Sequence, residues 1–121
     1  MSSLERLFSP RGIAIVGAQA DPSRGGGQPL RALLSYGYAG RVYPVNPRHS
    51  KMAGLKCYAS LSDIDGPCDV AVIAIPAAGV IDAVKECGAS GIPHAVVYSE
   101  AFGESGEQGT LRTMFTRRSA A

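Results

Sequence analysis

The sequence predicts a three-layer α/β sandwich around a mainly parallel sheet, and three observations support this prediction. Continuous apolar runs recur at 13–16, 70–75 and 95–98, and such runs are typical of strands covered on both faces. Segments with apolar residues at helical spacing separate these runs. The length of 121 residues fits one domain with its own core. Because the chain ends after a last helical pattern, we expect the sheet to lack its final strand.

The first third of the chain predicts a strand, a glycine-rich loop and a helix. The strand, residues 13–16, ends at Gly17, and the loop continues to Gly27. Pro29 fits the first turn of the helix, where its missing N–H costs nothing. The apolar stripe of this helix and its terminating glycine are Leu30, Leu33, Leu34 and Gly37. A small helix before the strand is expected to pack on the sheet through Leu4, Leu7 and Phe8.

The middle of the chain predicts two further strands of different length and one helical turn. Residues 41–45 predict a full strand, residues 56–59 a brief edge strand, and residues 61–64 the turn. The buried strand at 70–75 then ends at Pro76. A helix follows, with Gly88 as its C-terminal signal and with one apolar face made of Ala77, Val80, Ile81, Val84 and Cys87.

The last predicted elements are a buried strand at 95–98 and an amphipathic helix containing Leu111, Met114 and Phe115. We expect strand 70–75 to lie beside strand 13–16. Their carboxyl ends would then flank the point at which the strand order reverses, which is where such folds bind ligands.

Composition excludes several classes of protein. Cys57, Cys68 and Cys87 form no CxxC pair, and neither His49 nor His94 has metal-ligand spacing. We therefore expect reduced, partly buried thiols and no metal site. No apolar run is long enough to span a membrane and no signal peptide begins the chain, so a cytoplasmic protein is expected. The arginines near the C-terminus lack interleaved aromatic residues, which argues against nucleic-acid binding.

Charge is distributed unevenly along the chain. The first 56 residues hold eight Lys or Arg against two acidic residues, whereas residues 57–111 hold one Lys against eight. A basic half beside an acidic half indicates a region arranged for an anion.

The glycine-rich loop is the main candidate for such a region. Its glycines would let backbone N–H groups approach a phosphate at the start of a helix. Its spacing fits neither GxGxxG nor a P-loop, and the alternative is a flexible turn. The second strand ends in Asn46, where an NAD-binding fold places an acid. Arg48, His49 and Lys51 follow; they suit an additional ribose phosphate, as in NADP or coenzyme A, or form a solvated basic loop.

Two other strand ends are candidates at the same edge of the sheet. Pro76 either packs on an adenine ring or only ends its strand. Tyr98, Ser99 and Glu100 close the next strand, where they face the crevice or form a solvated loop.

Five segments together resemble a known family, and they lie in matching order between residue 4 and about residue 109. They are residues 7–18 (LFSPRGIAIVGA), 40–47 (GRVYPVNP), 57–61 (CYASL), 69–77 (DVAVIAIPA) and 99–102 (SEAF). This pattern resembles the CoA-binding domain of NDP-forming acyl-CoA synthetases, which include ADP-forming acetate–CoA ligase and the succinyl-CoA synthetase alpha subunit.

The resemblance implies a single Rossmann-like domain over residues 1–121 that binds coenzyme A. The loop would contact the phosphates, Asn46 with Arg48 the ribose phosphate, residues 75–77 the adenine end, and residues 99–100 the pantetheine path. The cofactor-binding residues implied in this way are Gly17, Ala18, Ser23, Arg24, Gly25, Gly26, Val45, Asn46, Arg48, Ile75, Pro76, Ala77, Ser99 and Glu100.

The sequence also departs from the family. Gln19 stands where the family has Ser, and Ala101 where it has Gly. The strand end Gly-Pro-Asn-Cys, the phosphohistidine domain and the ATP-grasp domain are absent, and residues 113–121 diverge. We therefore expect a CoA-binding domain that is catalytically incomplete alone and works with a separate ligase or ATP-grasp chain, or is a remnant of a longer ligase. The alternative is an NAD(P)- or nucleotide-sensing module of the same fold.

Overall fold

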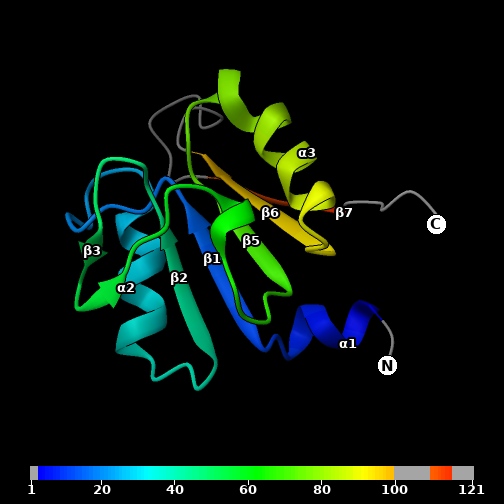
Figure 1. The fold of residues 1–121 in the computed structure, drawn as a ribbon, viewed down its shortest axis with the longest axis horizontal. Coiled ribbons are helices and arrows are strands. Elements are labelled where there is room, and N and C mark those ends of the chain that lie inside the picture. The colour runs from blue at the N-terminus through cyan, green and yellow to red at the C-terminus, as the bar shows by residue number, and fades with distance from the viewer. Residues whose placement is uncertain (1–2, 100–109, 116–121) are drawn as a thin grey trace.

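The computed structural model of this chain describes residues 3–99 and 110–115 (Figure 1). Its helices and strands are α1 (Ser3–Phe8), β1 (Gly12–Val16), α2 (Gly27–Ser35), β2 (Arg41–Val45), β3 (Lys51–Met52), β4 (Leu55–Lys56), β5 (Val70–Ile73), α3 (Val80–Ala89), β6 (His94–Ser99) and β7 (Thr110–Phe115), with 3₁₀ turns η1 (Leu61–Asp63) and η2 (Ala77–Gly79). None of the helices in this part of the chain has the length and apolar character of a membrane span.

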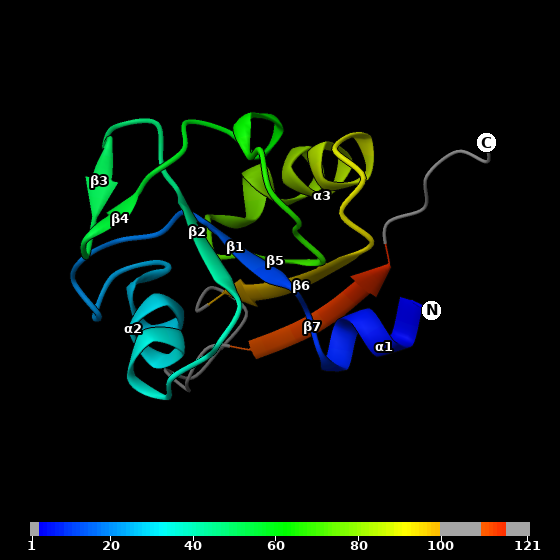
Figure 2. The same cartoon turned by 60° about the horizontal axis from the view of Figure 1, so that its bottom comes forward.

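The main sheet has the strand order β2-β1-β5-β6-β7. β2, β1, β5 and β6 run parallel, and β7 runs antiparallel to β6. α2 lies on one face of the sheet and α3 on the other (Figure 2). This arrangement confirms the Rossmann-like three-layer α/β class, and it confirms that strand 13–16 lies beside strand 70–75, with Ile13 opposite Val70.

The central strand β1 supplies both halves of the core, because neighbouring side chains of a strand point to opposite faces. Ala14 and Ile15 are both fully buried. Ala14 packs in a cluster with Ala83 and Cys87 of α3, whereas Ile15 packs with Leu30 of α2. The continuous aliphatic run of β1 is thus explained by burial on both sides.

The structure confirms the helix predicted after Pro76 as α3, but its buried face and its end differ from the prediction. Ile81, which was placed on the buried face, is 68% exposed, and Ala83 is buried instead. The helix continues past Gly88 to Ala89. Gly91, with a φ of 79°, has the left-handed conformation that often follows a helix end.

The predicted helix at Leu111 to Phe115 is wrong, because this segment forms β7. It pairs with β6 from Ser99 opposite Thr110 to His94 opposite Phe115. A short apolar pattern fits a helix and a strand equally well. Here the open edge of β6 decides, since β7 satisfies its backbone N–H and C=O groups. The sheet therefore has a fifth strand where we expected it to stop.

Two smaller expectations also need correction. The edge strand expected at 56–59 is instead the hairpin of β3 and β4, followed by a single parallel bridge between Tyr58 and Val45. The N-terminal helix is confirmed as α1, but Phe8 is 78% exposed and does not pack on the sheet.

The cysteines agree with the prediction of structural thiols. All three are free, and Cys57 and Cys87 are buried. Burial raises the pKa of Cys87 to about 12 and that of Cys68 to about 11, so both thiols stay protonated at neutral pH.

Candidate functional site

The carboxyl ends of β1, β2 and β5 meet at one edge of the sheet. The Gly17 N–H donates to the Val45 carbonyl at 3.0 Å, and the Ala74 N–H donates to the Val16 carbonyl at 2.9 Å. The glycine-rich loop leaves β1 at this edge and leads to the start of α2. The structure thus brings the predicted loop, the Asn46 segment and the segment after β5 together.

The loop is held by its own hydrogen bonds. The Gly26 N–H donates to the Gly17 carbonyl at 2.9 Å, and the Gly27 N–H donates to the Arg24 carbonyl at 2.8 Å. The backbone N–H and the hydroxyl of Ser23 both donate to the Asp21 carboxylate, at 2.9 and 2.7 Å. These two bonds hold the pKa of Asp21 below its ordinary value. The loop therefore has a defined shape set by local contacts.

Two of the glycines are required by close packing. Gly17 has a φ of 85°, and a Cβ there would meet the Ala74 carbonyl oxygen and lie 2.7 Å from Cγ2 of Ile75. A Cβ at Gly26 would lie 2.8 Å from the Gly17 carbonyl oxygen. A side chain at Gly17 would push the loop away from the end of β5, and one at Gly26 would push it away from the end of β1.

The N–H groups that remain available differ from those that the sequence suggested. The N–H groups of Gly17 and Gly26 donate within the protein, and Ala18 is fully buried. Among the described residues, the N–H groups of Gly25, just before α2, and of Gln28, in its first turn, have no backbone acceptor. The potential at the start of a helix is positive. Sequence reasoning missed Gln28, although its place in the first helical turn is a usable signal.

Asn46 is buried rather than open to the crevice. Asn46 is only 7% exposed. Its Nδ2 donates to the Ala18 carbonyl at 3.0 Å, and its Oδ1 accepts from the Arg48 N–H at 2.9 Å. Val45, also predicted as a contact, is 4% exposed. Both residues support the edge of the site from inside.

The cations around this edge are exposed, and none of them forms a salt bridge with a described carboxylate. Arg24, Arg48, His49 and Lys51 are all exposed. A salt bridge between described side chains joins Arg11 to Asp69, at the opposite end of the sheet. Unpaired cations beside free N–H donors are suited to a ligand with several phosphates.

The remaining predicted residues lie at two further strand ends. Ile75 is partly buried, whereas Pro76 and Ala77 are exposed at the start of η2. Ser99 ends β6, but its side chain and Glu100 lie outside the described residues. Tyr98, one residue earlier, donates its hydroxyl to Oε1 of Gln28 at 3.0 Å, so it joins the end of β6 to the start of α2.

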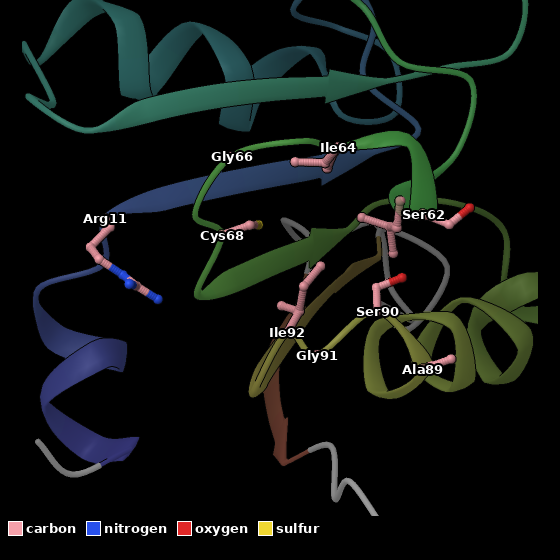
Figure 3. A pocket seen from close by; sticks show the side chains of 10 residues that line it. Arg11, Ser62, Ile64, Gly66, Cys68, Ala89, Ser90, Gly91 and Ile92 are labelled. Atoms are coloured by element: carbon pink, nitrogen blue, oxygen red, sulfur yellow. The ribbon is translucent and has the colours of Figure 1, made fainter.

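Cavities open on different sides of the sheet among the described residues. One of about 420 Å³ opens at the amino end, between the segment after η1 and the end of α3 (Figure 3). Arg11 lines it but is tied to Asp69. Another, of about 370 Å³, lies behind the glycine loop and beside Arg31. The third is an apolar groove of about 490 Å³ between α2 and strands β5 and β6. The described residues form no His, Cys, Asp and Glu cluster that could hold a metal ion.

Comparison with known proteins identifies the family of this chain. A family model described as a CoA binding domain matches residues 11–113. The chain is 41% identical over 106 residues to the alpha subunit of acetate–CoA ligase (ADP-forming) II from Pyrococcus furiosus, a match that covers 88% of this chain and 23% of that subunit.

Solved structures show the same similarity. A dinucleotide-forming acetyl-coenzyme A synthetase from Ca. Korarchaeum cryptofilum superposes with a TM-score of 0.73 and 51% identity, covering 76% of this chain and 20% of that one. A conserved hypothetical protein from Pyrococcus furiosus superposes with a TM-score of 0.62 and 37% identity, covering 69% of this chain and 70% of that one. The chain thus spans less than a quarter of the ligase relative and of the synthetase structure. By the extent of the family match and the fold they share, this chain belongs to the family of CoA-binding domains.

Proposed function

We propose that this chain binds coenzyme A at the carboxyl edge of its sheet and serves as the CoA-holding part of an NDP-forming acid–CoA ligase. The diphosphate would lie at the N–H groups of Gly25 and Gln28, within the loop that includes Gly17, Ser23, Arg24 and Gly26. Arg48 would face the ribose phosphate and residues 75–77 the adenine end. Ser99 and Glu100 would follow the pantetheine arm.

The observation that carries the proposal is the unpaired charge at this edge. Arg24 precedes α2 and Arg48 follows β2; both are exposed, and neither forms a salt bridge with a described carboxylate. NAD-binding folds place an acid at this strand end, where it accepts hydrogen bonds from the ribose hydroxyls. This chain has Asn46 there, and its amide hydrogen-bonds to the backbone of Ala18 and Arg48. An additional ribose phosphate therefore suits this edge better than a free ribose.

In this proposal the chain contributes the CoA-binding site of the ligase. Neither His49 nor His94 matches the phosphohistidine that ligases of this kind use, and ligase chemistry would require the remaining domains or a separate partner chain. The role of a partner chain is inferred from the relatives, because the ligase relative from Pyrococcus furiosus is named as an alpha subunit.

Titration calorimetry with CoA, dephospho-CoA and NADP tests the proposal. We expect micromolar binding of CoA that is weaker for dephospho-CoA. Arg48→Met should weaken CoA binding by about 1.5–3 kcal/mol, roughly 10- to 100-fold, with little effect on dephospho-CoA. Arg41→Met is the matched control, because it removes an exposed cation at the amino end of β2. Binding of NADP without CoA, or equal losses for both arginine variants, would contradict the proposal.

A further inference from the structure

Asn46 joins three segments that meet at the carboxyl edge. Its Nδ2 donates to the Ala18 carbonyl at 3.0 Å and its Oδ1 accepts from the Arg48 N–H at 2.9 Å. Its backbone N–H donates to the Tyr58 carbonyl at 2.9 Å. One buried residue thus links the glycine loop, the basic segment and the chain after β4.

The two side-chain bonds act on different parts of the proposed ligand site. The bond to Ala18 fixes the corner at which the glycine loop leaves β1. The bond from the Arg48 N–H closes an Asx turn over Asn46, Pro47 and Arg48, in which the asparagine oxygen accepts from the residue two positions later. This turn sets where the exposed arginine leaves the backbone.

The amide is required by this geometry. A carboxylate at position 46 could accept from Arg48 but could not donate to the Ala18 carbonyl, and two acceptor oxygens at 3.0 Å repel each other. An aliphatic side chain would leave the buried carbonyl and the N–H without partners. The replacement of an acid by asparagine at this strand end therefore has a structural cause besides any effect on ligand charge.

We infer that Asn46 is a positioning residue that fixes Arg48 relative to the glycine loop, and so sets the preference for a ligand with a ribose phosphate beyond its diphosphate. The inference rests on the proposed CoA site. Asn46 itself, being 7% exposed with both ends of its amide engaged, acts through Arg48 and through the loop.

A pair of variants separates the two bonds. Asn46→Ser and Asn46→Ala both remove the donor to Ala18. Serine retains an oxygen that can accept from the N–H two residues later, and alanine does not. The quantity measured is the ratio of CoA affinity to dephospho-CoA affinity, from calorimetry on the whole chain.

We expect both variants to bind dephospho-CoA equally, and more weakly than the parent. The ratio should stay near the parent value in Asn46→Ser and fall about threefold or more in Asn46→Ala, the size of one lost hydrogen bond. In an Arg48→Met background, Asn46→Ala should not change the ratio further. An unchanged ratio in Asn46→Ala, or equal ratios in Ser and Ala, would overturn the inference.

Two further results would have to be distinguished from a test of Asn46 itself. If the parent chain binds neither nucleotide, the proposed CoA site fails, which is a different result from an unchanged ratio. If Asn46→Ala does not fold, Pro47→Gly replaces it, because that change loosens the turn to Arg48 while the Asn46 amide stays. A parent-like ratio in Pro47→Gly would then overturn the inference.

Discussion

The two ends of the sheet treat polar groups in opposite ways. At the amino end, a buried carboxylate is paired: Asp69, 1% exposed, accepts from the Arg11 N–H at 2.8 Å, from Nε at 3.0 Å and from Nη2 at 2.7 Å. At the carboxyl end, Arg24, Arg48, His49 and Lys51 are exposed. The loop there is held by backbone hydrogen bonds together with the side chains of Asp21 and Asn46. Paired charge stabilises the fold, whereas unpaired charge beside free N–H groups is available to a ligand.

The largest effect that would test this contrast is expected from Asp69→Ala. Removing three charge-assisted bonds from a buried carboxylate should lower the free energy of unfolding by about 3 kcal/mol. Urea denaturation measures the loss, with the exposed Asp82→Ala on α3 as the matched control. CoA affinity of the folded variant should stay within about twofold of the parent. A clear loss of CoA affinity would break the distinction between the two ends.

The pH dependence sharpens the same prediction. The hydrogen bonds from Arg11 hold the pKa of Asp69 below its ordinary value. A lowered pKa in the folded state means that the carboxylate stabilises the fold fully above about pH 4 and loses that effect as pH falls through the folded pKa. The stability gap between parent and Asp69→Ala should therefore shrink on acidification. A gap that is constant from neutral pH to strongly acid pH would contradict this assignment.

A smaller effect is expected at the carboxyl end from Gly17→Ala. The left-handed backbone and the contact with the Ala74 carbonyl should together cost about 2 kcal/mol, and CoA affinity should fall with stability. Gly37→Ala is the control, because its φ of 73° is similar but no atom lies within 4 Å of the added Cβ. We expect Gly37→Ala to cost less, about 1 kcal/mol, and to leave CoA binding unchanged. Equal effects of the two variants would show that packing at β5 does not matter.

The smallest expected effect is an increase in stability, in the variant Ala53→Gly. Ala53, in the turn between β3 and β4, has a φ of 53°, which an alanine adopts at a cost. Ala53→Gly should raise the free energy of unfolding by about 1 kcal/mol, as thermal denaturation would show. CoA affinity should not change, because the strain lies in the hairpin and not in the loop or Arg48. A drop in affinity would place the hairpin turn in the binding site.

The sequence predicts the strands well because burial on both faces leaves a direct signal in composition. β1 and β2 agree with the predicted residues 13–16 and 41–45 nearly residue by residue. β7 was missed because its pairing depends on the open edge of β6, which no local pattern encodes. The exposed Ile81 shows the same limit, since the angle at which α3 meets the sheet decides which apolar residues are buried.

The candidate site was also predicted only in part from the sequence. The residue types at the strand ends, glycines and then cations, were visible in the sequence. The hydrogen bonds that use up the N–H groups of Gly17 and Gly26 were not, and neither were the contacts that bury Asn46. Which N–H groups of the loop remain available depends on acceptors both inside the loop, such as the Gly17 carbonyl, and distant in sequence, such as the Val45 carbonyl. The sequence pattern does not show either kind of partner.

The central position of β1 also has a consequence for how the chain folds. One partner, β2, follows soon after it, but the other, β5, comes much later, and Arg11 and Asp69 are 58 residues apart in sequence. Contacts of such separation form slowly, because the intervening loop must close first. During synthesis on the ribosome, the aliphatic run 13–16 therefore emerges well before β5 and has β2 as its first sheet neighbour. The rate at which β5 arrives sets how long one side of that strand stays unpaired.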